Sequence, residues 1–432
     1  MISGQDIKEL KQYLRREVSS SLGRDGLPQA SAVRDMISRS MDQKARSSHQ
    51  DITESIKRQI IDELCDDVFG FGPLEKLLKD GSISEIMVNG PGKIYVERDG
   101  KKILTPVHFD DDNHLRYIIE KMMIATGRRI DESSPYVDFS LPNGARVNAI
   151  IPPVATGGAV VTIRKMLTEL KKVEDVVRLG TMDDRMAEFL VACIKSKVNI
   201  LFSGATGSGK TTLLEILSAH IDAHERIVTI EDTLELSLRQ EHVVRLLTKP
   251  TNIEGKGEIT IKDLFRNSLR MRPSRIILGE IRGEEAMDYL QALNSGHRGC
   301  LAVIHSARPS EAIHRLETMS MYAGLNVNTA GVRRYISSGL NLIVQLEQFV
   351  DGTRKVTYVT EIGQLTDQGL LLRDIFRFEV EGVDEKDHVQ GSFKAMSTPG
   401  FLSLFRKRGV SVNANIFKPD VTQYEPDYWL RW

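Results

Sequence analysis

The chain has 432 residues, which is long enough for about two or three domains with a substantial hydrophobic core. Its formal net charge is -1, with 27% charged and 41% hydrophobic residues; this is an ordinary globular composition, and no basic excess indicates nucleic acid as a partner. It has three cysteines without a C-x-x-C pair and no run of eighteen apolar residues, which argues for a reducing compartment and against both a structural zinc site and a membrane-spanning helix.

Residues 1–50 are polar, mildly basic and rich in serine. This composition predicts a mobile N-terminal arm with one helix, and docking to a partner is the alternative. The pattern changes over residues 51–71, where Ile56, Ile60, Leu64 and Val68 recur every four residues. That spacing places apolar side chains on one helix face, so we expect a helical segment here.

Residues 72–165 are predicted to form a separate α+β domain. Short β-prone runs, a turn signal at Pro142-Asn143-Gly144 and one amphipathic helix at 114–126 define it. The strands are expected at 83–88, 94–97, 103–104, 136–139, 146–151 and 159–163. Residues 166–180 are charged and lack apolar periodicity, which indicates a linker to the next domain.

Arginines are conspicuous in the α+β domain, at Arg128, Arg129, Arg146 and Arg164. An arginine that faces a nucleotide site can stabilise the charge that develops on a γ-phosphoryl group. An exposed or ion-paired position on the surface is the alternative for each of them.

The stretch NILFSGATGSGKTT carries the most specific motif of the chain. Gly204, Gly209, Lys210 and Thr211 satisfy G-x-x-x-x-G-K-[ST], between a predicted buried strand and a predicted helix. Lys210 is expected to reach the β- and γ-phosphates of ATP, and the Thr211 hydroxyl to hold Mg²⁺; a glycine-rich turn without a ligand is the alternative. The residues expected to bind the nucleotide are Gly204, Ala205, Thr206, Gly207, Ser208, Gly209, Lys210, Thr211 and Thr212, together with Glu231 and Asp232 farther along the chain.

Acidic residues follow two further apolar strands of this domain. Glu231, Asp232 and Glu235 come after the strand expected at 227–230, and Glu280 follows a strand of the Walker B form. Because the carboxyl ends of parallel strands meet at one sheet edge, we expect these acids beside the phosphate loop. There one carboxylate can order the water shell of Mg²⁺ and another can polarise the attacking water. A helix-start carboxylate is the alternative for Glu280.

Two histidines flank the next strand, His297 before it and His305 at its end. Beside the Walker B strand they are candidates for sensing the γ-phosphate, with a structural role as the alternative. Strands and helices alternate through residues 181–415, which predicts a largely parallel sheet covered on both faces, as in P-loop α/β domains. From Asn328 onward this domain continues as a β-rich extension, and the aromatic tail at 416–432 is expected to pack on the domain or to dock a partner.

Residues 60–405 resemble the secretion ATPase superfamily that powers type II secretion, type IV pili and type IV secretion. The resemblance depends on four segments in order: Walker A as GATGSGKTT, an aspartate box as TIEDTLEL, Walker B as RIILGEIRGEEA, and a histidine box from His297 to His305. The segments IMVNGPGKIYVERDGK and RNSLRMRPSRIILGEIRG are similar to the branch that assembles tight-adherence (Tad/Flp) pili.

This resemblance implies a PAS-like domain, then a RecA-like motor domain, with six chains in a ring on the cytoplasmic face of the inner membrane. Polytopic platform proteins of that membrane are the implied partners, and ATP and Mg²⁺ the implied cofactors. Two departures from the family pattern, Ala205 in place of a glycine and Ser274 in place of an aspartate, remove no catalytic group.

The resemblance also implies residue roles: water activation by Glu235, Mg²⁺ ordering by Glu280, nucleotide contacts by Arg146 and Arg164, and a histidine-box pair of His297 and His305. The implied function is a hexameric Mg²⁺-dependent ATPase that powers a tight-adherence pilus, in assembly or retraction, or a type II secretion pseudopilus. A conjugation-type traffic ATPase or nucleic-acid translocase, and a weakly hydrolysing nucleotide-gated scaffold, are the alternatives.

Overall fold

The computed structural model describes residues 4–21, 29–48, 52–98, 100–124, 128–165, 172–249, 251, 256–324, 328–385, 387–420 and 427–430. The chain divides into two compact units, Met1–Leu167 and Thr168–Trp432. Each unit has hydrophobic cores of its own. None of the helices in the described ranges has the length and apolar character that a bilayer crossing needs.

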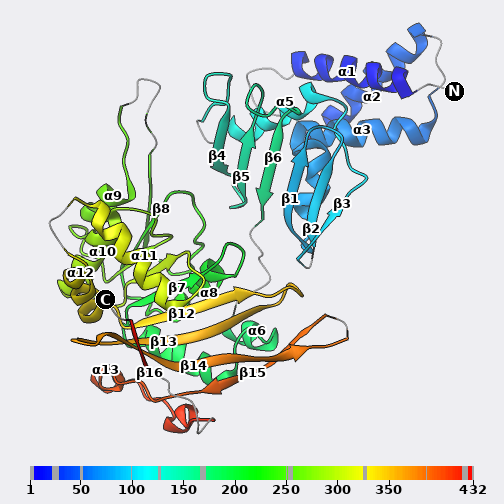
Figure 1. Ribbon diagram of the computed structural model, residues 1–432. Helices are drawn as coiled ribbons and strands as arrows, with labels where there is room; N and C mark the ends of the chain where they lie inside the picture. The colour runs from blue at the N-terminus through cyan, green and yellow to red at the C-terminus, as the bar shows by residue number, and fades with distance from the viewer. Residues whose placement is uncertain are drawn as a thin grey trace. The chain divides into compact units, whose positions relative to one another are not determined.

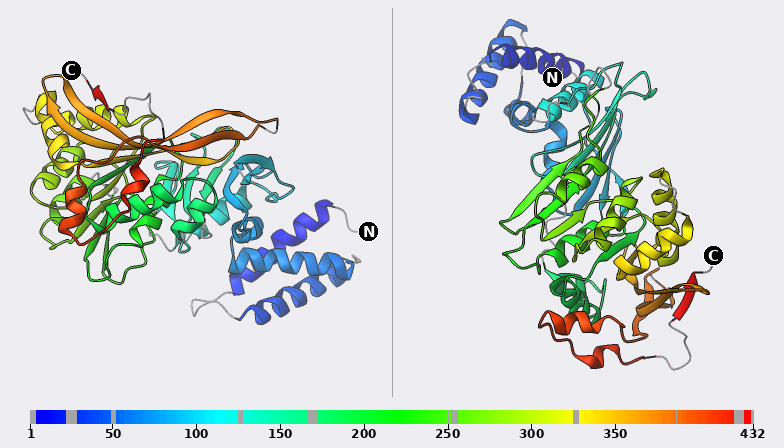
Figure 2. Two further views of the ribbon diagram at one scale, coloured as in Figure 1. Left: turned by 90° about the horizontal axis from the view of Figure 1, so that it is seen from below. Right: turned by 90° about the vertical axis from the view of Figure 1, so that its left-hand side faces the viewer.

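Three helices open the first unit: α1 (Gly4–Ser21), α2 (Ala30–Ser48) and α3 (Glu54–Phe69). They lie side by side (Figure 2) and share a small hydrophobic core. The structure therefore differs from the mobile arm expected for residues 1–50, of which 1–3, 22–28 and 49–50 lie outside the described residues. The reason is the spacing of Leu10, Leu14 and Val18, which gives the polar helix α1 one buried apolar face.

A buried cluster of charges joins these helices to the rest of the first unit. Arg15 of α1 contacts two carboxylates, with Nε 2.7 Å from Asp67 Oδ2 and Nη2 2.7 Å from Asp110 Oδ2. The ring of His114, in α5 (Asp112–Met123), lies 3.0 Å from Asp67 Oδ1. Because loss of one partner would leave a buried charge uncompensated, the cluster favours a single arrangement of α1 and α3 against α5.

A six-stranded antiparallel sheet forms the rest of the first unit, in the order β3-β2-β1-β6-β5-β4. Buried and exposed residues alternate along β5, and α5 packs its apolar residues on the buried face. These elements confirm an α+β architecture. The strands are β1 (Ile83–Asn89), β2 (Ile94–Arg98), β3 (Lys101–Leu104), β4 (Tyr136–Ser140), β5 (Arg146–Ile150) and β6 (Val160–Arg164), with η1 (Gly72–Leu74) and α4 (Glu75–Lys79) before them.

A ten-stranded sheet organises the second unit. Its strands β12-β7-β11-β10-β8-β9 are parallel, and β13, β14 and β15 continue it in antiparallel fashion (Figure 1). The α/β class with a parallel P-loop sheet is therefore confirmed. The ten strands are β7 (Ile200–Gly204), β8 (Ile227–Glu231), β9 (Val243–Leu247), β10 (Arg275–Leu278), β11 (Leu301–Ile304), β12 (Leu342–Gln348), β13 (Arg354–Thr366), β14 (Gly369–Val383), β15 (Val389–Ala395) and β16 (Asp427–Leu430).

Helices cover both faces of the parallel strands. On β7, Ile200 and Phe202 face one core while Leu201 faces the other, because successive side chains point to opposite faces of a strand. The first core is completed by α6 (Val173–Arg178), α7 (Asp184–Lys195) and α8 (Lys210–Ser218). The second is completed by α9 (Ile261–Ser268), α10 (Glu285–Asn294), α11 (Pro309–Tyr322) and α12 (Thr329–Gly339). Of the expected linker at 166–180, residues 166–171 lie outside the described residues and α6 follows them.

The C-terminal region packs on the sheet extension. After α13 (Leu402–Lys407) and η3 (Ala414–Phe417), strand β16 (Asp427–Leu430) pairs with β14, where Arg373 Nε lies 2.6 Å from Asp427 Oδ1. Of the expected tail at 416–432, residues 421–426 and 431–432 lie outside the described residues. The described part of the tail therefore completes a sheet edge within its own chain.

Candidate nucleotide site

The phosphate loop joins the end of β7 to the start of α8. Gly204, Gly207 and Gly209 have positive φ angles of 153°, 82° and 95°, a region that side chains with a Cβ rarely enter. A Cβ on Gly204 would also lie 2.3 Å from the carbonyl oxygen of Leu346 in β12. Glycine is thus required by conformation and by close approach, and the loop leaves a backbone cradle at a helix N-terminus that suits phosphate.

Lys210 is the first residue of α8, and only 5% of it is exposed. Its Nζ donates to the carbonyl oxygen of Ala205 at 2.8 Å and lies 3.4 Å from His305 Nδ1. Thr211 and Thr212 follow it, half-buried. The ammonium group that the motif predicts for the phosphates therefore lies inside the loop.

Arg354 of β13 also contacts the phosphate loop, a position that was not predicted from the sequence. Its Nε donates to the carbonyl oxygen of Gly207 at 2.7 Å. No local pattern marks this residue, because only the pairing of β13 with β12 and of β12 with β7 brings it to the loop.

Glu280 follows β10 and lies between two cationic or polar partners. Its Oε1 lies 3.1 Å from His305 Nε2, and its Oε2 lies 2.6 Å from Arg282 Nη2. Burial would raise the pKa of Glu280, but the hydrogen bonds from His305 and Arg282 outweigh it and lower the pKa to about 2. Glu280 is therefore a carboxylate at any pH at which the protein would work.

The partners of His305 fix the roles of its two ring nitrogens. An ammonium group only donates hydrogen bonds, so Nδ1 accepts from Lys210 and Nε2–H donates to Glu280. Arg282 extends the chain of contacts, with Nη1 3.7 Å from Asp232 Oδ2. One polar network thus links the phosphate loop to the ends of β11, β10 and β8, where parallel strands were expected to gather their chemistry.

Glu231 takes a different position from the nucleotide contact that its motif suggested. It is the last residue of β8 and only 2% exposed, and its Oε1 accepts the backbone N–H groups of Glu235 and Leu236, each at 2.9 Å. Its Oε2 is buried without a hydrogen-bond partner among the described residues. The side chain therefore holds the loop that carries Glu235, and the nucleotide contact expected of Glu231 stays a prediction.

Replacing Glu231 with glutamine is expected to change how stability depends on pH. Burial raises the pKa of this carboxyl from 4.5 to about 7, although the N–H groups of Leu236 and Glu235 that donate to it act to lower the pKa, so the folded chain keeps a proton that the unfolded chain loses. The contribution of this protonated carboxyl to the free energy of unfolding is complete below pH 4.5 and is lost as the pH rises through about 7. Between about pH 5 and pH 8 the natural chain should lose on the order of 2 kcal/mol relative to the glutamine variant. Urea denaturation of both chains at the two pH values measures this, and identical pH dependence would contradict a neutral carboxyl.

His297 is not brought to the phosphate loop within one chain. It precedes β11, whose Leu301 pairs with Ile200 at the start of β7, whereas His305 follows Ile304 at the other end. Its Nδ1 lies 3.2 Å from Ser295 Oγ. His297 precedes β11 and His305 follows it, so the two histidines lie at opposite ends of this strand. Of the two, only His305 joins the polar network.

Arg146 and Arg164 lie side by side in the first unit, as register partners on β5 and β6. Arg164 Nε lies 3.8 Å from Glu85 Oε1. The phosphate loop belongs to the second unit. The nucleotide contacts expected of these two arginines stay a prediction.

The residues of the loop fit ATP and Mg²⁺ as ligands. The cradle at the start of α8 supplies backbone N–H groups, and Thr211 with Glu280 supplies oxygen ligands of the kind that Mg²⁺ prefers. Among the described residues no group of three or more His, Cys, Asp or Glu side chains could hold a metal alone.

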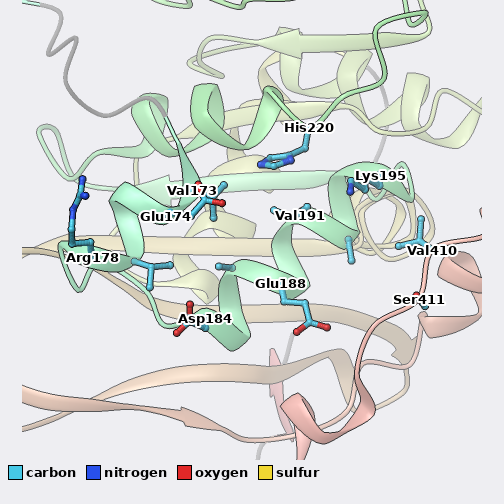
Figure 3. A pocket seen from close by; sticks show the side chains of 13 residues that line it. Val173, Glu174, Arg178, Asp184, Glu188, Val191, Lys195, His220, Val410 and Ser411 are labelled. Atoms are coloured by element: carbon cyan, nitrogen blue, oxygen red, sulfur yellow. The ribbon is translucent and has the colours of Figure 1, made fainter.

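A separate pocket lies at the far end of α8 from the phosphate loop. It has a volume of about 500 Å³ and is lined by residues of α6 and α7 together with His220 and Val410 (Figure 3). Its apolar residues include Val173, Val177 and Val191. No residue of the phosphate loop lines it, so this pocket is not the nucleotide site.

Comparison with known protein families identifies the chain's relatives. The family described as type II/IV secretion system protein matches residues 67–373. The chain belongs to this family. The matched range of this secretion-system protein includes the phosphate loop, both acid-bearing loops, both candidate histidines and the arginine pair of the first unit.

Individual relatives of this secretion-system protein were found among curated proteins and solved structures. A putative conjugal transfer protein of Mycobacterium tuberculosis is 31% identical over 301 residues, covering 68% of this chain and 85% of the relative. Protein VirB11 of Rhizobium radiobacter is 30% identical over 327 residues, covering 68% and 91%. The structure of the VirB11 ATPase from the Brucella suis type IV secretion system is 28% identical, covers 66% of this chain and 94% of its own, and has a TM-score of 0.37.

Proposed function

We propose that this secretion-system protein is a Mg²⁺-dependent ATPase motor. The observation that carries the proposal is the polar network that runs from Lys210 through His305 and Glu280 to Arg282. It links a phosphate cradle to strand-end acids on neighbouring strands, the arrangement that phosphoryl transfer to water requires. A nucleotide-gated scaffold would not need acids in this position.

The residues of the loop would bind the nucleotide and hold its γ-phosphoryl group for attack. Backbone N–H groups of the cradle and the Lys210 ammonium pair with phosphate oxygens, while Thr211 and Glu280 would hold Mg²⁺. The metal, when bound, neutralises charge on the phosphate oxygens. Glu235 then accepts a proton from the attacking water, and His305 is placed to report the γ-phosphate to Glu280.

The proposal extends to assembly and location. Six copies would form a ring at the cytoplasmic face of the inner membrane, held there by polytopic platform proteins. The sequence segments similar to the tight-adherence branch support a pilus motor, for assembly or retraction, as the first candidate. Relatives that are named conjugal transfer proteins favour a conjugation-type traffic ATPase as the second.

The two candidates differ in what the motor moves. Deleting the gene in its native host and assaying surface pili and DNA transfer separately would distinguish them. Loss of pili with normal DNA transfer supports the pilus motor, and the reverse result supports the conjugation-type motor. Neighbouring genes for pilin, prepilin peptidase and two platform proteins would point to the pilus.

Replacing Glu235 with alanine is expected to lower the rate of ATP hydrolysis by about 100-fold or more, because general-base assistance of this kind typically contributes 10²–10⁴-fold. Nucleotide affinity should change little, since the cradle and Lys210 are unaltered. Phosphate release at saturating MgATP measures the rate, and the exposed Glu241→Ala on a neighbouring loop serves as the control. An unchanged rate in the Glu235 variant would remove it from the water-activating role.

A further inference from the structure

Glu231 is buried beneath the loop that carries Glu235. Its side chain passes Gly279 at the end of β10, where a Cβ would lie 2.9 Å from Glu231 Cγ. The backbone N–H of Gly279 donates to the carbonyl oxygen of Ile230 at 2.9 Å, which holds the two strand ends together. Glycine at position 279 thus leaves room for a buried glutamate between the two acid-bearing loops.

One oxygen of this side chain binds the loop at two successive residues. The N–H groups of Glu235 and Leu236 both donate to Glu231 Oε1, and the loop from Asp232 to Leu236 forms no helix or strand. Leu236 is itself buried in the core of the second unit. The carboxyl group of Glu231 therefore fixes the backbone at Glu235 through these two hydrogen bonds.

The loop after β10 is held by the same device. Glu285, buried at the start of α10, accepts the N–H groups of Arg282 and Gly283 on its Oε1, at 2.6 Å and 2.9 Å. Two buried glutamates thus each hold one of the two loops that carry the acids and Arg282. A shared arrangement on neighbouring loops indicates that the buried acceptor has a positioning role.

We propose that Glu231 is a positioning residue for ATP hydrolysis, which acts by holding the Glu235 backbone and thereby its carboxylate at the reacting water. The inference rests on the proposed ATPase function. This role requires an acceptor oxygen at the distance from the backbone that a glutamate side chain spans. It does not require a negative charge on the side chain. A contact to nucleotide or metal differs, because it would depend on the charge of the side chain and would tolerate a change in side-chain length.

Two variants separate reach from charge. Glu231→Gln keeps an acceptor oxygen at the same distance along the side chain, whereas Glu231→Asp keeps the carboxyl but shortens the side chain by one methylene. The matched control is Glu361→Asp, because Glu361 of β13 is also buried and accepts the N–H of Gly400 at 3.0 Å. Glu361 pairs with Leu342 at the start of β12, and Leu342 pairs with Ile200 at the start of β7. Glu361 therefore lies at the end of these strands that is opposite to the phosphate loop.

Steady-state phosphate release gives kcat and KM, titration with a fluorescent ATP analogue gives nucleotide affinity, and thermal melting confirms that each variant is folded. We expect Glu231→Asp to lower kcat by about 10- to 100-fold, since a displacement near 1 Å at a reacting group can cost that much. Its affinity for the analogue should stay within about threefold, because the phosphate loop is unaltered. Glu231→Gln and Glu361→Asp should keep kcat within about threefold of the natural chain.

Three results would overturn the inference. Glu231→Asp could match the natural chain, Glu231→Gln could lose as much activity as Glu231→Asp, or Glu361→Asp could lose as much as Glu231→Asp. The second result would make the carboxylate itself reactive, and the third would reduce the effect to general destabilisation. A natural chain that hydrolyses no ATP overturns the proposed function and this inference together, whereas the three results above leave the proposed function standing.

Discussion

Replacing Lys210 with alanine is expected to reduce ATP hydrolysis at least about 100-fold, the loss typical of removing one preorganised donor from a site of developing negative charge. Lys210 Nζ is buried in the loop and also lies 3.4 Å from His305 Nδ1. The variant therefore loses both the phosphate-binding ammonium and the start of the polar network. Phosphate release at saturating MgATP measures the rate, and a fluorescent ATP analogue measures the loss of affinity.

The control for this variant is Lys195→Ala. Lys195 ends α7 and lines the pocket at the far end of α8, so its removal tests the general effect of losing a lysine from the same unit. It should hydrolyse ATP at the rate of the natural chain. Normal turnover in the Lys210 variant would end the ATPase proposal, because no other residue of the motif supplies an ammonium group to the phosphates.

The phosphate loop and the Walker B acid could be predicted because each depends on local sequence. Glycines at fixed spacing, a buried strand before them and a helix after them specify the loop conformation without reference to distant residues. The alternation of strands and helices then predicts a parallel sheet, and a parallel sheet gathers strand ends at one edge. These steps place Glu280 beside the loop, and the structure shows it joined to Lys210 through His305.

The direction of β11 separates His297 from the phosphate loop within one chain. A residue that precedes a strand and a residue that follows it lie at opposite ends of that strand. Two residues that flank one strand are therefore far apart in space. Both His297 and His305 were predicted to be functional because they flank the strand beside the Walker B strand, and the family resemblance also contains both. Within one chain, the strand direction that the sequence predicts places His305, and not His297, at the end of β11 that meets the phosphate loop.

Other features of the site depend on contacts that no sequence pattern carries. The burial of Glu231 follows from the close packing of β8 against β10 and from the absence of a side chain at Gly279. Arg354 reaches the loop only because β13 pairs with β12. In each of the N-terminal helices α1 and α2, three buried apolar residues on one face outweigh a composition that favours disorder, since burial depends on spacing rather than on average polarity.

Replacing Glu280 with glutamine is expected to leave ATP bound while lowering its hydrolysis by about 100- to 1000-fold, as for loss of a group that stabilises transition-state charge. The natural side chain is ionised, because its pKa is lowered to about 2, and it accepts from His305 on one oxygen and from Arg282 on the other. An amide can accept on one side only. Its NH₂ group would face either the Nε2–H of His305 or the guanidinium of Arg282, so one contact becomes an opposition of two donors.

This opposition distinguishes the Glu280 variant from a simple loss of charge. Glu284→Gln is the matched control, because Glu284 lies on the same loop and pairs with Lys262 at 2.6 Å at a partly exposed position. The control should hydrolyse ATP normally, whereas the Glu280 variant should bind a fluorescent ATP analogue with affinity within about threefold of the natural chain and release phosphate slowly. Because Glu280 stays ionised throughout the working pH range, the natural chain's rate should not fall between about pH 6 and pH 8 through this residue. A Glu280 variant that turns over at the natural rate would show that the metal and its water are ordered by another group, and the network from Lys210 to Arg282 would then be a structural feature of the sheet edge.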